Sequence, residues 1–291
     1  LRSGINKKGK KNILNLIISK SGNTLETITN LNTLKINKNC IFITENKNNY
    51  LKKIAEKIKC EIIEHKNYIG GRYSVLSEVG MLPAELMGLN EKKFKQFNYL
   101  INNKIFINNL INNVEGILGC IKKRKTNSVI LNYDEDSQSL FYWYQQLVAE
   151  SLGKKSKGIL PLVSLMPKDN HSLMQLYLDG PKNNFFTFFD VFNQKSEKIC
   201  KSSLLKSHSY LKNKSVNEII FAQRLATEKI FKKKKIPFRS FFVKKKNEQT
   251  LGELFCFFIL ETILLGRALK VNPFDQPSVE LIKKETRKFL I

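Results

Sequence analysis

The sequence has 291 residues, which is enough for one large domain or two smaller ones with a real core. Its formal net charge is +25, but the lysines are spread along the whole chain, and no helix-turn-helix or zinc-finger spacing occurs. The composition therefore favours a solvated basic surface over a nucleic-acid interface, and the same charge would attract acidic small substrates.

The first residues and the cysteines of the sequence indicate where in the cell the protein is located. The chain begins with Leu1 instead of Met, so we expect that a longer protein has an N-terminal part that is missing here. The first apolar run, residues 13–18, is too short for a signal peptide or a membrane span. The five cysteines form no CxxC pair, which indicates reduced thiols in a cytoplasmic protein, and the three histidines lack metal-ligand spacing.

Strand and helix patterns alternate in the first third of the chain. Strands are predicted at residues 13–19, 40–44 and 61–64, and helices at 24–34, 50–59 and from a Gly-Gly turn at 70–71 to Met87. Short apolar strands that alternate with amphipathic helices predict a parallel sheet with helices on its faces. Pro83 predicts a kink or break in the last of these helices.

The alternation resumes after two predicted linking helices. These helices span 91–106 and 112–123; strands follow at 128–133, 158–166, 185–192 and 238–243, and helices at 139–152, 171–178, 216–235, 251–269 and from Pro277 to near the C terminus. We therefore predict an α/β protein with two lobes. Residues 1–95 would form a partial first lobe, and residues 96–291 the linking helices, the second lobe and the C-terminal helices.

The turn after the first predicted strand has the layout of an anion site. An apolar run, a hydroxyl-rich turn and a helix start offer free backbone N–H groups and a favourable helix dipole. Hydroxyl donors are supplied by Ser19, Ser21, Thr24 and Thr27. Ligands of parallel sheets bind at the carboxyl ends of strands, where this turn lies. A plain helix cap remains the alternative for such a turn.

Two further segments allow a functional or a structural interpretation. Arg72 follows the Gly-Gly turn, so it either offers a fixed cation to an anionic group or caps a carbonyl or pairs with a carboxylate. Glu150 lies one helical turn after Gln146, on the same face. A carboxylate beside aromatic residues can serve as a proton shuttle, but a solvent-facing Glu is the simpler interpretation.

A functional and a structural interpretation are also both possible for His171, Gln276 and Lys283. His171 follows a polar loop, where a His is most often a cap or a surface residue. Gln276 and Lys283 are seven residues apart, about two helical turns, so we expect them on one helix face. A basic helix surface is the alternative for both.

Taken together and in chain order, these segments resemble the motifs of the glucose-6-phosphate isomerase (phosphoglucose isomerase) family. The matching segments are the phosphate-binding loop SKSGNTLET (19–27), the GGRYS signature (70–74), QQLVAE with the catalytic glutamate (145–150), PKDNHS with the catalytic histidine (167–172), and the C-terminal LGELF (251–255) and NPFDQPSVELIK (272–283). The resemblance implies two sugar-isomerase (SIS) lobes, each a parallel sheet flanked by helices.

The resemblance also implies an activity. It would be the interconversion of glucose 6-phosphate and fructose 6-phosphate through a cis-enediol(ate), in glycolysis and gluconeogenesis. The substrate would be a sugar phosphate, the chain would be a homodimer that shares His171 across its interface, and neither nucleic acid nor a membrane would be a partner. A non-catalytic sugar-phosphate-binding SIS module is the alternative. A nucleic-acid binder, suggested by the charge alone, ranks third.

The family assigns a role to each matching residue. Glu150 would move a proton between C1 and C2, and Arg72 would stabilise the enediolate. His171 and Lys283 would assist ring opening, with Glu26 hydrogen-bonded to the histidine. Substrate binding would involve Ser19, Lys20, Ser21, Thr24, Thr27, Gly71, Gln146 and Gln276. Such a reaction needs one base and a fixed cation, so no metal and no other cofactor is expected.

The sequence departs from the family pattern in three places. The family's N-terminal portion, with a glycine-rich loop that contacts substrate, is absent. Ile282 stands where a small residue is common, and Met166 precedes Pro167. We expect a half-built first lobe to leave a sheet edge and apolar faces exposed, so that this chain aggregates more readily than a full-length one.

Overall fold

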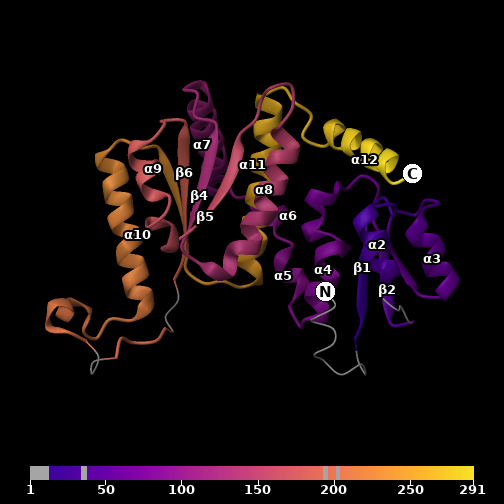
Figure 1. The fold of residues 1–291 in the computed structure, drawn as a ribbon, viewed down its shortest axis with the longest axis horizontal. Coiled ribbons are helices and arrows are strands. Elements are labelled where there is room, and N and C mark those ends of the chain that lie inside the picture. Colours follow the sequence, from indigo (N-terminus) through magenta and orange to yellow (C-terminus); the bar gives the residue numbers. More distant parts are fainter. Residues whose placement is uncertain (1–12, 34–37, 193–195, 201–203) are drawn as a thin grey trace. The chain divides into compact units, whose positions relative to one another are not determined.

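Two parallel sheets, each in its own unit of the chain, organise the structure (Figure 1). The structure is a computed structural model that describes residues 13–33, 38–192, 196–200 and 204–291. The units are Leu1–Lys95, the first unit, and Gln96–Ile291, the second unit. Leu1 and the predicted helix end at Leu34 lie outside the described residues.

The first unit is built on a three-stranded parallel sheet with the order β1-β2-β3. Its elements are β1 (Asn15–Ile18), α2 (Leu25–Thr33), β2 (Cys40–Thr44), α3 (Tyr50–Ile58), β3 (Glu61–Glu64), η1 (Gly71–Leu76), α4 (Glu78–Leu86) and α5 (Glu91–Phe94). The central strand β2 buries neighbouring side chains on both faces, since Phe42 and Ile43 are both fully buried. Phe42 packs with Leu51 and Ala55 of α3 and Leu31 of α2.

The second unit is built on a four-stranded parallel sheet with the order β5-β4-β6-β7. Its elements are α6 (Phe97–Leu100), α7 (Lys104–Lys122), β4 (Asn127–Asn132), η2 (Glu135–Ser137), α8 (Gln138–Leu152), β5 (Leu160–Leu165), η3 (Lys168–Asn170), α9 (Met174–Asp179), β6 (Asn184–Val191), η5 (Lys206–Leu211), α10 (Val216–Lys233), β7 (Phe238–Val243), α11 (Glu248–Ala268) and α12 (Pro277–Phe289).

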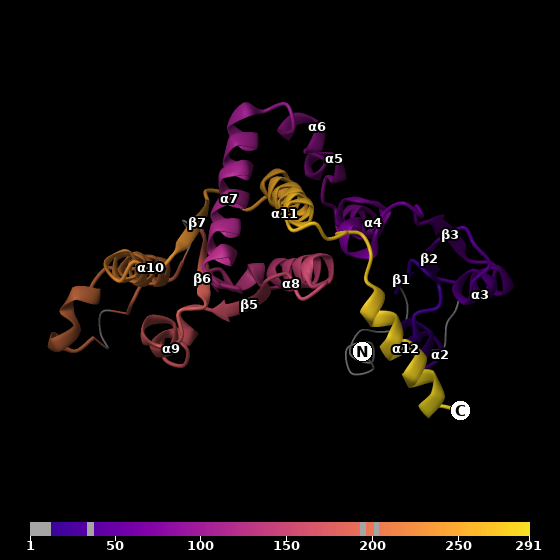
Figure 2. The same ribbon diagram turned by 90° about the horizontal axis from the view of Figure 1, so that it is seen from above.

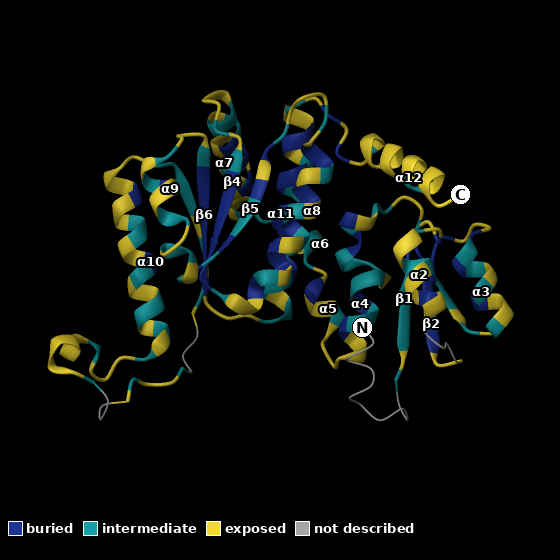
Figure 3. Cartoon of the chain, viewed as in Figure 1, coloured by how far each residue is buried: buried dark blue, intermediate teal, exposed yellow. Residues whose placement is uncertain are grey.

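Helices cover both faces of this second sheet, with α9 and α10 on one side and α7, α8 and α11 on the other (Figure 2). Phe188 of β6 packs against Phe231 of α10, whereas the next residue, Phe189, contacts Phe141 of α8. This alternation explains the aromatic run of β6, because a strand covered on both faces buries side chains of both orientations. Strands β4 and β6 are accordingly buried along most of their length, whereas α12 is largely exposed (Figure 3).

The α/β prediction is confirmed, but some predicted helices have different bounds. The predicted helix at 91–106 is divided into α5 and α6, and α7 begins earlier than predicted, because the Asn103 side chain caps it at the N–H groups of Ile105 and Phe106. Pro83 does not break α4, which Ser77 caps and which runs on to Leu86. The helix predicted from His171 begins only at Met174.

Among the described residues, no helix is long and apolar enough to cross a membrane.

Candidate functional site

The hydroxyl-rich turn lies between β1 and α2, at the carboxyl end of a parallel strand, as predicted. Ser19 is buried, and its Oγ lies 2.7 Å from Oγ1 of Thr24. Ser21 is exposed and its Oγ accepts a hydrogen bond from the Asn23 N–H (3.3 Å). Thr27 is half-buried in the first turn of α2. The turn therefore gathers hydroxyls at a helix start, where an anion is stabilised.

Gly22 fixes the path of this turn. Its φ of +62° lies in the left-handed region, and an added Cβ would come within 1.9 Å of Oδ1 of Asn49. Asn49 caps α3 by accepting from the Lys52 N–H, and it donates to Oγ1 of Thr44 (3.2 Å). The turn after β1 is thus held directly against the loop after β2, and only glycine fits the point of contact.

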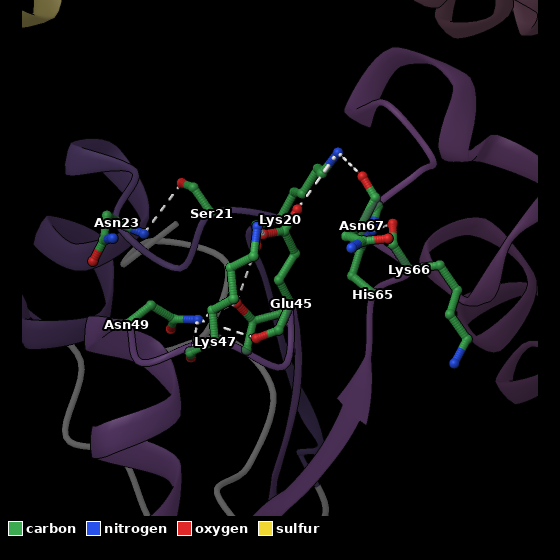
Figure 4. Close-up of polar contacts among 10 residues, drawn as sticks. Lys20, Ser21, Asn23, Glu45, Lys47, Asn49, His65, Lys66 and Asn67 are labelled. Carbon is green, nitrogen blue, oxygen red and sulfur yellow. Dashed lines mark hydrogen bonds and ion pairs between the residues drawn. The ribbon is translucent and has the colours of Figure 1, made fainter.

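Lys20 links this turn to the segment that precedes the Gly-Gly turn. Its Nζ donates to the backbone carbonyl of Asn67 (2.8 Å) and lies 3.5 Å from a carboxylate oxygen of Glu45 (Figure 4). Glu45 also pairs with Lys47 at 3.0 Å. Burial by itself would raise the pKa of Glu45, but the hydrogen bond and charge of Lys47, together with Lys20, hold it below its ordinary value. In the structure the Lys20 ammonium, which we predicted to bind substrate, contacts protein groups.

A cavity of about 310 Å³ opens beside this linkage, at the carboxyl ends of β2 and β3. It is lined by Glu45, Asn46, Lys47, Glu64, His65, Lys66, Asn67 and Tyr68. None of these residues was predicted from the sequence, yet several of them directly follow predicted strands. The rule that located Ser19, that ligands bind where parallel strands end, could have found them.

Arg72 is buried inside the first unit. It is only 4% exposed, lies in η1, and its guanidinium is 5.3 Å from the ring centre of Tyr73. Gly71 beside it is exposed, and a Cβ there would meet no atom within 4 Å. The turn is closed by Ser74, whose hydroxyl donates to the Gly71 carbonyl (2.6 Å). The Gly-Gly backbone is therefore accessible, while the cation next to it is fixed by its surroundings. Glu26, also in this unit, is exposed on α2.

Gln146 and Glu150 meet on α8 in the second unit, as their spacing predicted. Nε2 of Gln146 donates to Oε1 of Glu150 at 3.1 Å. Glu150 is half-buried and Gln146 is exposed. The helix presents its opposite face to the core through Tyr144 and Leu147, so the position of the carboxylate is set by a well-packed helix.

His171 lies in the loop between β5 and α9, with an exposed side chain. Its backbone N–H donates to the Lys168 carbonyl (3.1 Å). The loop begins with a cis peptide between Met166 and Pro167. Asp169, which the sequence analysis did not single out, accepts three hydrogen bonds in this loop.

The prediction that Gln276 and Lys283 share a helix face is wrong. Helix α12 begins at Pro277, and Gln276 has φ −155° and ψ 61°, which is not helical, so the helical period does not apply to it. Lys283 lies on α12, where its Nζ is 2.6 Å from a carboxylate oxygen of Glu280. Gln276 is half-buried and Lys283 is exposed.

The predicted residues thus fall into two groups within different units. The first unit holds the hydroxyl turn, Lys20, Glu26, Gly71 and Arg72, and the second holds the Gln146–Glu150 pair, His171, Gln276 and Lys283. Within the described ranges, no cluster of three or more His, Cys, Asp or Glu side chains could hold a metal ion.

Comparisons with known proteins identify the family. The profile of the family described as phosphoglucose isomerase matches residues 2–164, which is more than half of the chain. The glucose-6-phosphate isomerase of Methanocaldococcus jannaschii is 33% identical over 282 residues, which cover 92% of this chain and 69% of that protein. A Methanococcus maripaludis protein named "Probable glucose-6-phosphate isomerase" is also 33% identical, with 92% of this chain and 63% of that protein covered. The chain thus spans about two-thirds of the length of these relatives.

Solved structures agree on the fold. A hypothetical protein from Thermus thermophilus matches with a TM-score of 0.89 and 25% identity, over 99% of this chain and 74% of that chain. A glucose-6-phosphate isomerase from Chlamydia trachomatis matches with a TM-score of 0.77 at 18% identity, over 99% of this chain and 61% of that chain. The family profile and the curated relatives establish that the chain belongs to the phosphoglucose isomerase family.

Proposed function

We propose that this protein is an aldose–ketose isomerase that interconverts glucose 6-phosphate and fructose 6-phosphate. The observation that carries the proposal is the contact between Gln146 and Glu150 in the segment that resembles the family's catalytic one. The Glu150 carboxylate is half-buried, and its Oε1 lies 3.1 Å from Nε2 of Gln146. The names of the curated relatives support the same activity. We include in the proposal a cytoplasmic location and a part in glycolysis and gluconeogenesis.

The phosphate would bind at the turn between β1 and α2. The hydroxyls of Ser19, Ser21, Thr24 and Thr27 would donate to it, and the start of α2 would favour its negative charge. The backbone at Gly71 and the loop residue Lys20 would complete this side of the site. Binding energy from a dianionic phosphate, far from the reacting carbons, would position the sugar for proton transfer.

Glu150 would act as the single base. It would take the C2 proton of the open-chain aldose to give a cis-enediolate with its charge on O1. A proton would then pass from O2 to O1, and Glu150 would return its proton to C1 to give the ketose. Arg72 would stabilise the enediolate charge as a fixed cation. Gln146 and Gln276 would bind sugar hydroxyls, and His171 and Lys283 would assist ring opening, with Glu26 orienting the histidine.

We also propose how the chain is divided into lobes and how it assembles. Residues 1–95 would be a partial first SIS lobe, and residues 96–291 would hold the linking helices, the second lobe and the C-terminal helices. The active form would be a homodimer in which His171 serves the site of the neighbouring subunit.

The test is a coupled assay of fructose 6-phosphate conversion by the chain and by its Glu150→Gln variant. We expect the substitution to lower turnover by about 10²- to 10⁴-fold, because it removes the base. Asp179→Asn is the matched control, since Gln175 donates to Asp179 (3.1 Å), four residues later on α9, in the same way. Unchanged turnover in Glu150→Gln would contradict the mechanism.

A non-catalytic sugar-phosphate-binding module is the second candidate. It is favoured by one observation, that the hydroxyl turn lies wholly within the first unit while Glu150 belongs to the second. Calorimetry with fructose 6-phosphate distinguishes the two: binding by the unsubstituted chain without turnover would support the module and reject the isomerase for this chain.

A further inference from the structure

Asp169 occupies the centre of the loop that carries His171, and both oxygens of its carboxylate are engaged. Oδ2 accepts hydrogen bonds from Oγ of Ser164 (2.8 Å) and from the N–H of Leu165 (2.9 Å). Oδ1 accepts from Oγ of Ser172 (2.9 Å). One carboxylate therefore joins the end of β5 to the residue that directly follows His171.

The two sides of this bridge differ in rigidity. Ser164 is fully buried, and Leu165 is in register with Asn132 of the adjacent strand β4, so the donors on β5 are held in place by the paired strand. The segment with His171 and Ser172 is exposed. Because the His171 side chain is exposed, its direction depends on the backbone that bears it. Through its hydrogen bonds, Asp169 holds that backbone to the end of β5.

The ionic state of Asp169 agrees with this role. Burial would raise its pKa, but the hydrogen bonds from Ser164, Ser172 and the Leu165 N–H lower it below its ordinary value. Both carboxylate oxygens therefore act as hydrogen-bond acceptors. The Leu173 N–H, which donates to the Asp169 carbonyl (3.0 Å), closes the same turn through the backbone.

We infer that Asp169 is a positioning residue that fixes the loop bearing His171 so that the histidine can assist ring opening. The inference rests on the proposed function, in which His171 has that task. Its contribution is geometric: the three hydrogen bonds hold the loop, and the negative charge as such is dispensable.

Two substitutions separate geometry from charge. Asp169→Ala removes all three acceptor contacts. Asp169→Asn retains them without the charge, because the amide oxygen can accept from the Leu165 N–H while the amide NH₂ donates to the Ser172 hydroxyl, which can also accept. Asp179→Ala is the matched control, an exposed aspartate on neighbouring α9 that pairs with Lys234.

We expect Asp169→Ala to lower kcat by about 10- to 100-fold with little change in KM, because a displaced catalytic group costs rate in that range. Asp169→Asn should stay within about threefold of the unsubstituted chain and keep its pH profile, and Asp179→Ala should be unchanged. An Asp169→Asn variant as poor as Asp169→Ala, or with a shifted pH profile, would overturn the geometric role. So would full activity in Asp169→Ala.

Two NMR measurements test the inference without relying on turnover. They are the rate of amide hydrogen exchange at Leu165 and the chemical shifts of the His171 ring. Asp169→Ala should accelerate the exchange and shift the ring signals, whereas Asp169→Asn should leave both as they are. If the unsubstituted chain shows no isomerase activity, the proposed function fails, and these signals alone decide whether Asp169 holds the loop.

A second variant covers the case in which Asp169→Ala does not fold. The double substitution Ser164→Ala/Ser172→Ala leaves Asp169 in place and removes two of its three donors. We expect an intermediate loss of kcat, with the His171 ring signals shifted in the same direction. No change in either quantity would reject the inference.

Discussion

At the scale of single residues, Glu45 illustrates how charge is balanced beside the candidate phosphate turn. Its side chain is only 11% exposed, and it lies 3.0 Å from Lys47 and 3.5 Å from Lys20. The two lysines compensate for burial of the carboxylate and keep its negative charge from repelling an anion at the neighbouring turn. Lys47 is a near neighbour of Glu45 in the sequence, whereas only the fold brings Lys20 to it, from the end of the adjacent strand.

The lowered pKa of Glu45 predicts a pH-dependent contribution to stability. A carboxylate whose pKa in the folded state is below its ordinary value of 4.5 stabilises the fold above that pH, and the stabilisation is lost as the pH falls through the folded-state pKa. Glu45→Gln should therefore lower the urea midpoint at pH 7 but make little difference near pH 3. Glu64→Gln, in an exposed pair with Lys66, is the control and should have a smaller effect. A Glu45→Gln effect of equal size at both pH values would contradict the prediction.

At the scale of secondary-structure elements, a buried polar network joins the helices and strands of the second unit. Arg239 of β7 forms an ion pair with Glu261 of α11, which is fully buried. Arg239 also donates to Oγ1 of Thr187 on β6 (3.0 Å) and to Oδ1 of Asn113 on α7 (3.2 Å). Its Nη2 also donates to Oη of Tyr144 on α8 (3.5 Å), so five elements meet at this guanidinium. Burial by itself would lower the pKa of Arg239, but the charge of Glu261 raises it above its ordinary value.

Breaking this network should be costly. Glu261→Ala leaves a buried guanidinium without its counter-charge, which costs about 3–5 kcal/mol in comparable cases. Glu285→Ala on α12 removes the partner of an exposed Lys288 and should cost less than about 1 kcal/mol. Urea unfolding of the two variants gives the comparison. Equal and small losses for both substitutions would show that the buried pair does not hold these elements together.

At the scale of the whole molecule, the net charge of +25 affects how an anionic substrate, such as the proposed sugar phosphate, approaches the protein. The charge does not come from one patch of the sequence, so its effect is a general positive potential that raises the local concentration of a sugar phosphate. Salt screens such a potential, whereas short-range contacts within a site are screened less.

We therefore expect KM for fructose 6-phosphate to rise with sodium chloride between about 0.05 and 0.5 M, as the Debye length shrinks, while kcat stays nearly constant. Steady-state kinetics at several salt concentrations measure both constants. A non-ionic osmolyte at matched osmolality is the control. A fall in kcat with unchanged KM would mean that salt acts on the chemistry or on the fold instead of on substrate attraction.

The pattern of neighbouring residues along the sequence was enough to predict the secondary-structure elements and one part of the candidate site. The bounds of β2, β3 and β7 are those predicted, because each contains a short apolar or aromatic stretch next to polar residues. The Gln146–Glu150 contact also follows from spacing, since residues four apart in a helix are neighbours. Family membership was predicted from short motifs in chain order, and the comparisons confirm it.

The remainder depended on contacts between distant segments. The sequence could not predict that Lys20 contacts Asn67 or that Arg72 is buried. It also offered no reason to pair Arg239 with Glu261. Each of these depends on which side chains the sheet and its helices bring together, and such long-range proximity has no period that a sequence reveals.

The sequence by itself thus determined the α/β class, the order of strands and helices, the hydroxyl-rich turn and the family. These follow from hydrophobic periodicity, capping residues and short motifs, all of which act between near neighbours. Only the tertiary structure decided how buried charges are compensated. The reason is that a buried carboxylate such as Glu45 is stabilised by whichever charged groups surround it in space, and folding brings Lys20 to it from the end of another strand.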